Sequence, residues 1–152
     1  MRMRLSARVD YALRAVCELS AASDGRPVTA ERLATAQEIP PKFLESILLQ
    51  LRRSGVINAQ RGPEGGYWLA RPADEITLAD VIRVIDGPLA NVRGQRPEDL
   101  GYHGAAAGLQ EVWISLRATE REILDLVTIA DVVTNDLPDR VRKLAADPRA
   151  WS

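Results

Sequence analysis

The segment from residue 41 to residue 70 limits the fold most, because it joins one helical pattern to a short β-hairpin pattern. Pro41 suits a first helical position, and apolar residues recur at helical spacing from there to about Ser54. Gly55 is placed to end this helix. Two β-prone runs, 56–60 and 67–70, then flank the glycine-rich stretch 61–66. A hairpin that directly follows an amphipathic helix with a polar outer face is typical of a winged helix.

Two further helices are expected before this segment. Apolar spacing predicts the first between Ser6 and Ala22, and the turn-forming residues 23–27 stop it. Thr29 is placed to cap a second, short helix that ends near Ala36. Because only a short connection separates the second and third helices, the sequence predicts a helix-turn-helix whose recognition helix is the third.

The second half of the chain begins with a helix that Thr77 and Asp80 are spaced to cap. Residues 89–108 contain five glycines or prolines and little periodicity, which predicts a flexible loop with about one turn of helix. From Leu109 to about Asp136, apolar residues alternate in steps of four and three, which predicts one continuous helix about 40 Å long. Such a helix favours a homodimer. The residues expected at the dimer contact are Val112, Leu116, Ile123, Leu126, Ala130 and Val133.

The predicted fold class is therefore mainly α with a small β-hairpin wing. Residues 1–72 would form a winged helix-turn-helix, and residues 73–152 a helical linker, the loop 89–108 and the dimerisation helix 109–136 with a short, partly ordered tail. No internal repeat is evident. The first part carries 11 basic and 7 acidic residues and the second 9 and 14, although the net charge is −1. A basic lobe beside an acidic one indicates a polyanionic partner for the winged helix.

Double-stranded DNA is the polyanion that this predicted shape fits. A helix fits the major groove, and a glycine-bordered tip carrying Arg61 fits the minor groove, whose potential attracts guanidinium groups. Glu45 is suited to accept from a cytosine amino group, and Thr29 with the free N–H groups behind it to meet a phosphate. A solvated helix face and an ordinary tight turn stay open as simpler interpretations. The candidate DNA-binding residues are Thr29, Pro40, Pro41, Lys42, Glu45, Gln60, Arg61, Gly62, Gly65 and Gly66.

Other classes of function are disfavoured by what the sequence lacks. Cys17 is the only cysteine and His103 the only histidine, so one chain holds no disulfide and no CxxC or multi-histidine metal site. Cys17 falls on the apolar side of the first helix, where a small buried hydrophobe is a simpler interpretation than a redox sensor. No nucleophile–base pair, phosphate-binding glycine loop or paired-carboxylate site is evident, so we expect neither an enzyme nor a cofactor.

The chain also lacks long apolar runs. None approaches the ~20 residues of a membrane-spanning helix, and the amino terminus lacks the apolar stretch of a secretory signal. With 152 residues the chain can form one cooperative domain and a short appendage. We therefore expect a cytoplasmic protein.

Several stretches resemble the Rrf-two family of winged helix-turn-helix transcriptional regulators, the IscR, NsrR and CymR type. They are residues 5–13, 39–45, 51–57, 61–72, 76–81 and 86–89, and they span nearly the whole chain. The most specific is the wing motif R-G-P-E-G-G-Y-W-L-A-R-P at 61–72. The resemblance implies a dimer whose long helices cross and whose two winged helices bind a pseudo-palindromic operator. It further implies that Arg61 enters the minor groove and that Pro40 to Glu45 meet the major groove.

One departure from the family pattern concerns iron. Cluster-binding members place three cysteines in the loop after the Asp-Gly-Pro-Leu turn, assisted by an acidic or histidine ligand that in some members comes from the first helix. Asp10 matches the acidic position, but residues 89–108 hold no cysteine, and an iron–sulfur cluster needs mostly thiolate ligands. We expect no cluster; whether Asp10, Cys17 or His103 binds another metal stays open. The resemblance points instead to members that regulate sulfur and cysteine metabolism in response to a partner protein or a small molecule.

The expected function is thus a sequence-specific, DNA-binding transcriptional regulator. We expect a dimeric repressor of sulfur, cysteine or redox metabolism, with operator DNA and a second copy of the chain as its partners. A winged-helix protein-interaction module that does not bind DNA is the alternative. DNA binding through several arginines should fall steeply with added salt and show sequence preference, and this distinguishes the two.

Overall fold

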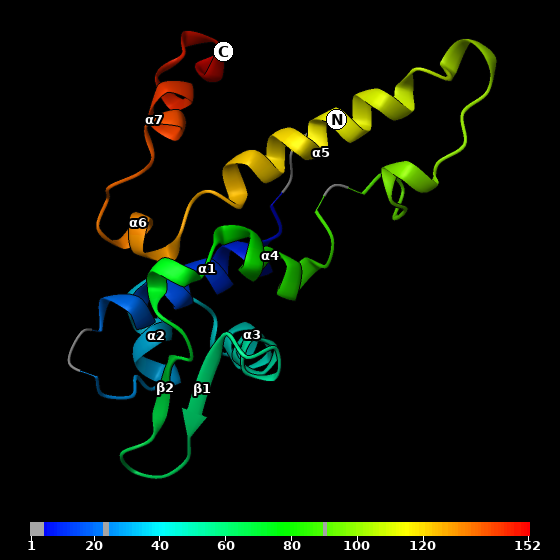
Figure 1. The fold of residues 1–152 in the computed structure, drawn as a ribbon. Coiled ribbons are helices and arrows are strands. Elements are labelled where there is room, and N and C mark those ends of the chain that lie inside the picture. Colours follow the sequence, from blue (N-terminus) through cyan, green and yellow to red (C-terminus); the bar gives the residue numbers. More distant parts are fainter. Residues whose placement is uncertain (1–4, 23–24, 90) are drawn as a thin grey trace.

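A computed structural model describes residues 5–22, 25–89 and 91–152. The helices are α1 (Ala7–Ala21), α2 (Ala30–Gln37), α3 (Pro41–Arg53), α4 (Leu78–Asp86), α5 (Leu109–Leu124), α6 (Ile129–Val133) and α7 (Asp139–Ala146), and the strands are β1 (Ile57–Gln60) and β2 (Gly66–Leu69) (Figure 1). Short 3₁₀ turns lie at Ala73–Glu75, Pro97–Asp99, Gly104–Ala106 and Pro148–Trp151. The predicted fold class is confirmed, since the described chain is mainly helical with one antiparallel hairpin and a long helix in its C-terminal half.

The first helix forms the centre of the winged helix. It packs against α2, α3, α4, α6 and β2, and its inner face contributes Ala12, Ala15, Val16 and Leu19 to the main core. Helix α3 adds a full apolar stripe. Its buried residues are Leu44, Ile47, Leu48 and Leu51. The spacing of these side chains is the one that the sequence predicts, so the helix-turn-helix is held by burial of one face of each helix.

The helix boundaries follow their capping residues. The hydroxyl of Ser6 accepts a hydrogen bond from the Val9 N–H at 3.1 Å, and the hydroxyl of Thr29 accepts one from the Arg32 N–H at 3.2 Å. Pro41 opens α3, and Gly55 follows its end with φ of 83°. The predicted caps and ends of the first three helices are therefore confirmed to within about two residues.

The predicted dimerisation helix 109–136 is wrong in its extent, because α5 ends at Leu124. Thr128 has an extended backbone, with φ of −96° and ψ of 163°, and it caps the separate helix α6. Val127 and Ile129 on either side of it are both buried. In an extended segment, residues two apart point to the same side, so both side chains can be buried together. Leu126 lies in the connection and is 44% exposed. The predicted heptad pattern continued past this break because Ala130 and Val133 have the sequence spacing of a heptad, although they lie on a separate helix.

Two of the expected dimer residues consequently lie on α6 rather than on the long helix. Val133 packs against the main core of its own chain, and Ala130 is half-buried. Val112 and Leu116 lie on α5 and are exposed, and Ile123 is half-buried near the end of that helix. The exposed apolar seam that the structure retains is therefore the first part of α5.

A short internal repeat, which the sequence analysis missed, explains the break. T-L-A-D-V at 77–81 and T-I-A-D-V at 128–132 each form a capping box, in which the threonine hydroxyl accepts from the aspartate N–H and the aspartate carboxylate accepts from the threonine N–H. Thr77 and Thr128 face each other in an antiparallel bridge. The repeat therefore places the starts of α4 and α6 side by side.

The predicted flexible loop 89–108 includes a segment that lies against α5. Pro97 and Leu100 are buried, and the Gln110 side chain donates to the carbonyls of Pro97, Glu98 and Leu100. Two 3₁₀ turns occur where about one helical turn was expected. Glycines and prolines break periodicity without preventing such contacts, so composition alone suggested too little structure.

The tail is also more regular than expected, because α7 and a 3₁₀ turn occupy it. Arg140 of α7 forms an ion pair with Glu122 of α5 at 2.7 Å. Within the described ranges, no helix combines the length and the apolar character that crossing a membrane requires.

Candidate nucleic-acid interface

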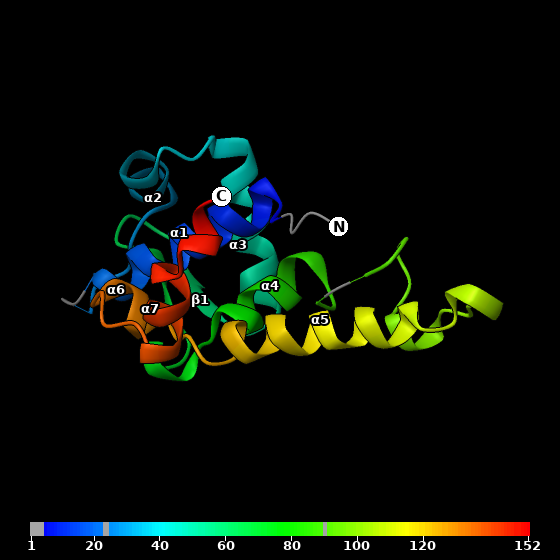
Figure 2. The same cartoon turned by 90° about the horizontal axis from the view of Figure 1, so that it is seen from above.

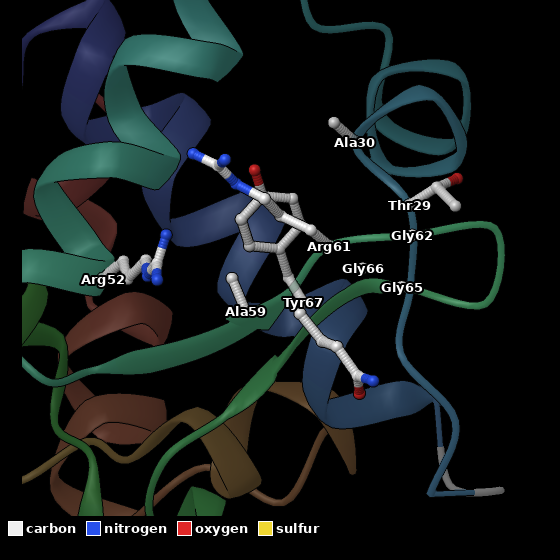
Figure 3. A pocket seen from close by; sticks show the side chains of 10 residues that line it. Thr29, Ala30, Arg52, Ala59, Arg61, Gly62, Gly65, Gly66 and Tyr67 are labelled. Carbon is white, nitrogen blue, oxygen red and sulfur yellow. The ribbon is translucent and has the colours of Figure 1, made fainter.

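An open concavity of about 510 Å³ lies between the start of α2, the C-terminal part of α3 and the hairpin (Figure 3). Its lining residues are Thr29, Ala30, Arg52, Ala59, Gln60, Arg61, Gly62, Gly65, Gly66 and Tyr67. Arg52 enters from α3 and Arg61 from the hairpin tip, while Thr29 stands on the opposite side at the start of α2. The start of α2 thus forms one surface with the end of α3 and the hairpin that follows it.

The connection between α2 and the hairpin is a backbone pairing. Val28 donates its N–H to the Tyr67 carbonyl at 2.9 Å and accepts the Tyr67 N–H at 2.8 Å, so the residue before Thr29 extends the two-stranded sheet. A Cβ atom at Gly66 would lie 2.6 Å from the Val28 carbonyl oxygen, and Gly66 has φ of 151°. Glycine is therefore required at residue 66 for Thr29 to lie beside the wing.

The hairpin tip is closed by a tight turn. β1 pairs with β2 so that Ile57 faces Leu69 and Gln60 faces Gly66, and the Gly65 N–H donates to the Gly62 carbonyl at 3.0 Å. A Cβ atom at Gly65 would lie 2.1 Å from the Gln60 carbonyl oxygen. Arg61, the first residue after β1, is exposed, and its side chain points from the hairpin into the concavity toward α3 (Figure 3).

The predicted major-groove residues occupy a separate part of the surface. Pro40, Pro41, Lys42 and Glu45 are exposed at the N-terminal end of α3, outside the lining of the concavity. The structure therefore brings together Thr29, Gln60, Arg61, Gly62, Gly65 and Gly66, and it leaves the start of α3 as a second exposed patch.

Arg52 and Tyr67 line the concavity but were not among the predicted site residues. Arg52 belongs to the polar outer face that the sequence predicts for the third helix, and Tyr67 forms part of the wing motif, so a signal existed for each residue. The sequence did not predict that both residues line the concavity, because Arg52 lies next to the hairpin only when the hairpin has folded back beside α3.

Cations on α3 and the hairpin are available to a ligand. The side chains of Lys42, Arg52, Arg53 and Arg61 are exposed, and none of these side chains forms an ion pair or hydrogen bond with another described residue. Other arginines, such as Arg14, Arg83 and Arg117, are paired with carboxylates of the chain. An unpaired set of cations on one surface is the electrostatic requirement for binding a polyanion.

Hydrogen bonds with α1 and α4 hold α2 and α3 in place. The Arg8 guanidinium donates to the Gln50 side-chain oxygen, and the Gln50 amide donates to the Val84 carbonyl at 3.5 Å. Arg14 donates to the Gln37 carbonyl at 2.6 Å and pairs with Asp10 at 3.0 Å. Asp10, which matches the acidic ligand position of the family pattern, is thus a salt-bridge partner of Arg14.

The donor set does not fit an iron–sulfur cluster. Cys17 is half-buried against the main core, where burial, and secondarily the Glu18 carboxylate, raises the pKa of its thiol above the ordinary value. His103 is exposed on a different part of the chain. Within the described residues, no group of three or more His, Cys, Asp and Glu side chains is arranged to hold a metal ion. One thiol with a raised pKa cannot supply the thiolates that a cluster needs.

Comparison with known proteins identifies the fold and its family. A family model named Rrf2, described as an iron-dependent transcriptional regulator, matches residues 5–135. A Mycobacterium tuberculosis protein named as an HTH-type transcriptional regulator is 49% identical over 148 residues, which cover 97% of this chain and 92% of the relative. The HTH-type transcriptional regulator CymR of Bacillus subtilis is 30% identical over 132 residues, which cover 87% of this chain and 91% of CymR.

Solved structures show the same arrangement. The structure of B. subtilis CymR, described as the global cysteine regulator, aligns with a TM-score of 0.75 at 28% identity and covers 88% of this chain and 98% of that one. IscR of T. potens aligns with a TM-score of 0.71 at 27% identity and covers 88% of each chain. The family consists of regulators that bind DNA and are not enzymes. With its winged helix, its wing motif and these relatives, the chain belongs to the Rrf2 family of HTH-type transcriptional regulators.

Proposed function

We propose that this regulator is a dimeric, cytoplasmic repressor that binds a pseudo-palindromic operator through two winged helices. The observation that carries the proposal is the set of exposed, unpaired cations on α3 and the hairpin. Arg52 and Arg61 line the concavity, Arg53 follows Arg52 at the end of α3, and Lys42 lies at the other end of that helix. A surface of this kind attracts the phosphate backbone, and the two projecting elements have the dimensions of the two grooves.

Each projecting element has its own role in this proposal. The start of α3 presents Pro41, Lys42 and Glu45 to base edges in the major groove. Arg61 enters the minor groove, where close approach is possible because glycines border it on the tip. Thr29 and the first N–H groups of α2 contact a phosphate beside the concavity, and this fixes the register without reading sequence.

The second copy binds along α5. This helix of 16 residues buries no residue within its own chain, and Leu109, Val112 and Leu116 are between 38% and 48% exposed. An apolar stripe of this spacing that its own chain leaves exposed is typical of a helix–helix contact. Dimerisation through α5 would also supply the two-fold symmetry that a palindromic operator requires.

The signal that this repressor senses is proposed to come from sulfur or cysteine metabolism through a small molecule or a partner protein. Similarity to CymR, described as a global cysteine regulator, supports this class. The single, half-buried Cys17 disfavours iron–sulfur sensing, which would need several thiolates.

In-vitro selection of bound fragments from random double-stranded DNA tests the proposal. We expect enrichment of one pseudo-palindromic sequence, with affinity that falls steeply as salt is added. Arg61→Ala should lose most of the enrichment, whereas Arg149→Ala, which removes an exposed arginine of the tail, should retain it. A pool without enrichment would contradict the proposal and favour the alternative of a protein-interaction module.

A further inference from the structure

The C-terminal end of α5 is fixed to the winged helix at one place, which we call the α4–α6 junction, residues 76–80 and 127–131. Leu78 donates its N–H to the Val127 carbonyl at 3.0 Å, and Ile129 donates its N–H to the Ile76 carbonyl at 2.8 Å. Ile76 and Ile129 are both fully buried in the main core. The junction therefore ties the segment that follows α5 to the body that carries α3 and the hairpin.

Two side-chain contacts reinforce the same end of α5. Arg83 of α4 pairs with Asp125, the residue that follows α5, at 3.1 Å. Leu124 packs against a second apolar cluster that includes Val9 and Ile82. From this end α5 extends away from the winged helix, and its exposed apolar residues lie along the extending part (Figures 1 and 2).

This geometry makes α5 a lever whose angle is set at the junction. Val112 lies about 18 Å along the helix from Leu124, since each residue adds about 1.5 Å. A rotation of about 10° at the junction would move the surface around Val112 by roughly 3 Å relative to the winged helix, which is close to the ~3.4 Å rise of one base pair. A small rotation at the junction therefore shifts the α5 surface by a distance comparable to the rise of one base pair.

We propose that the α4–α6 junction determines the spacing of the two half-sites that the dimer can occupy, with the Leu78 N–H and Thr128 as its positioning groups. The inference rests on the proposed function, because it takes α5 as the dimer contact and α3 with the hairpin as the DNA contact. A rigid junction holds the two lobes at one separation. A loosened junction spreads the dimer over several separations, and only the fraction with the matching separation binds the operator at full affinity.

A pair of substitutions at Leu78 tests the backbone hydrogen bond from the Leu78 N–H to the Val127 carbonyl. Leu78 is the first residue of α4 and Thr77 before it is extended, so proline fits the backbone there while removing the N–H that Val127 accepts. Leu78→Ala is the matched control, because it removes the half-buried side chain but keeps that N–H. The difference between the two variants therefore measures the effect of losing this hydrogen bond, because both variants lose the apolar contact of the leucine side chain.

The experiment measures binding of full-length protein to the selected operator, to one isolated half-site and to operators whose half-sites are one or two base pairs closer or farther apart. We expect the two Leu78 variants to bind the isolated half-site within about twofold of each other. The spacing preference of each variant is the ratio of its affinity for the best operator spacing to its affinity for the neighbouring spacings. We expect this ratio to be about fivefold smaller for Leu78→Pro than for Leu78→Ala, the size expected from loss of one backbone hydrogen bond. Equal spacing preference in the two variants would overturn the inference.

A second pair covers the case in which Leu78→Pro loses its helical circular dichroism. Thr128→Ala removes the acceptor of the Asp131 N–H in the capping box of α6, and Thr134→Ala removes an exposed hydroxyl that donates to the Ala130 carbonyl at the other end of α6. Only Thr128→Ala should broaden the accepted spacing. If both variants keep the wild-type spacing profile, the inference is wrong while the proposed function stands. If the wild type binds no operator, the proposed function itself fails.

Discussion

Val28 and Tyr67 exchange both of their backbone hydrogen bonds, at 2.9 and 2.8 Å, and this pairing makes the start of α2 a neighbour of the wing. The two candidate DNA-contacting elements on this side of the molecule, Thr29 and the hairpin tip, therefore move as one unit. A phosphate bound at Thr29 would fix the depth at which Arg61 enters the adjacent groove.

Substitution of Gly66 should break this unit. Gly66→Ala places a Cβ atom 2.6 Å from the Val28 carbonyl oxygen and forces alanine to adopt φ of 151°. We expect a loss of about 1–3 kcal/mol in the free energy of unfolding, since backbone cannot yield as a flexible side chain would. Denaturant unfolding measures it. Gly101→Ala is the control, because open space surrounds that residue, and an equal loss in the two variants would refute the explanation.

A charge on the exposed stripe of α5 should dissociate the dimer. Leu116→Glu puts a carboxylate among the apolar side chains that we expect a second copy to cover, and desolvating it would cost several kcal/mol. Sedimentation should show a folded monomer at micromolar concentration with weakened operator binding. Ala118→Glu adds the same charge on the opposite side of the helix and should remain dimeric. A wild-type protein that is itself a monomer at this concentration would contradict the proposed dimer.

The thiol of Cys17 should ionise only at high pH. Burial raises the pKa of this thiol and Glu18 raises it further, so the folded protein favours the neutral form. We expect slow reaction with a thiol reagent at pH 8 that speeds up when the protein is unfolded. In the unfolded chain the Cys17 thiol ionises at its ordinary pKa of about 9. The contribution of the neutral thiol to the free energy of unfolding should therefore fall as pH rises above about 9. Rapid labelling of the folded protein at neutral pH would show that this environment is misjudged.

Protein purified without oxygen should be colourless. A cluster needs several thiolates, and the chain has one cysteine. Visible absorption spectroscopy with iron and sulfide analysis measures this. An absorption band accompanied by matching iron and sulfide would disprove the expectation and direct attention to Asp10, Cys17 and His103.

Local signals predicted most of the winged helix because each depends on neighbours in sequence. Thr29 as a cap, Pro41 as a helix start and the Thr77–Asp80 capping box all lie where these residue types favour them. The pairing of Val28 with Tyr67 carried no comparable signal, because one long-range residue pair leaves no periodicity. Hence Arg52 and Tyr67 were missed as parts of the concavity.

The error in the long helix had a different cause. Heptad spacing and a capping box competed over residues 125–133, and the capping box prevailed because Val127 and Ile129 become buried when Thr128 is extended. The T-I-A-D-V pattern was visible in the sequence as a second copy of T-L-A-D-V. The prediction followed heptad periodicity alone and contained no internal repeat, so the predicted helix was too long.

The most direct test of DNA recognition by the winged helix is a titration of the selected operator with the wild type, Arg61→Ala and Arg149→Ala at matched salt concentrations. Arg61→Ala should weaken binding by about 1–3 kcal/mol and reduce the preference for A·T-rich steps beside the half-sites, while Arg149→Ala should bind like the wild type. Equal affinity and equal sequence preference in all three proteins would show that the wing does not read DNA.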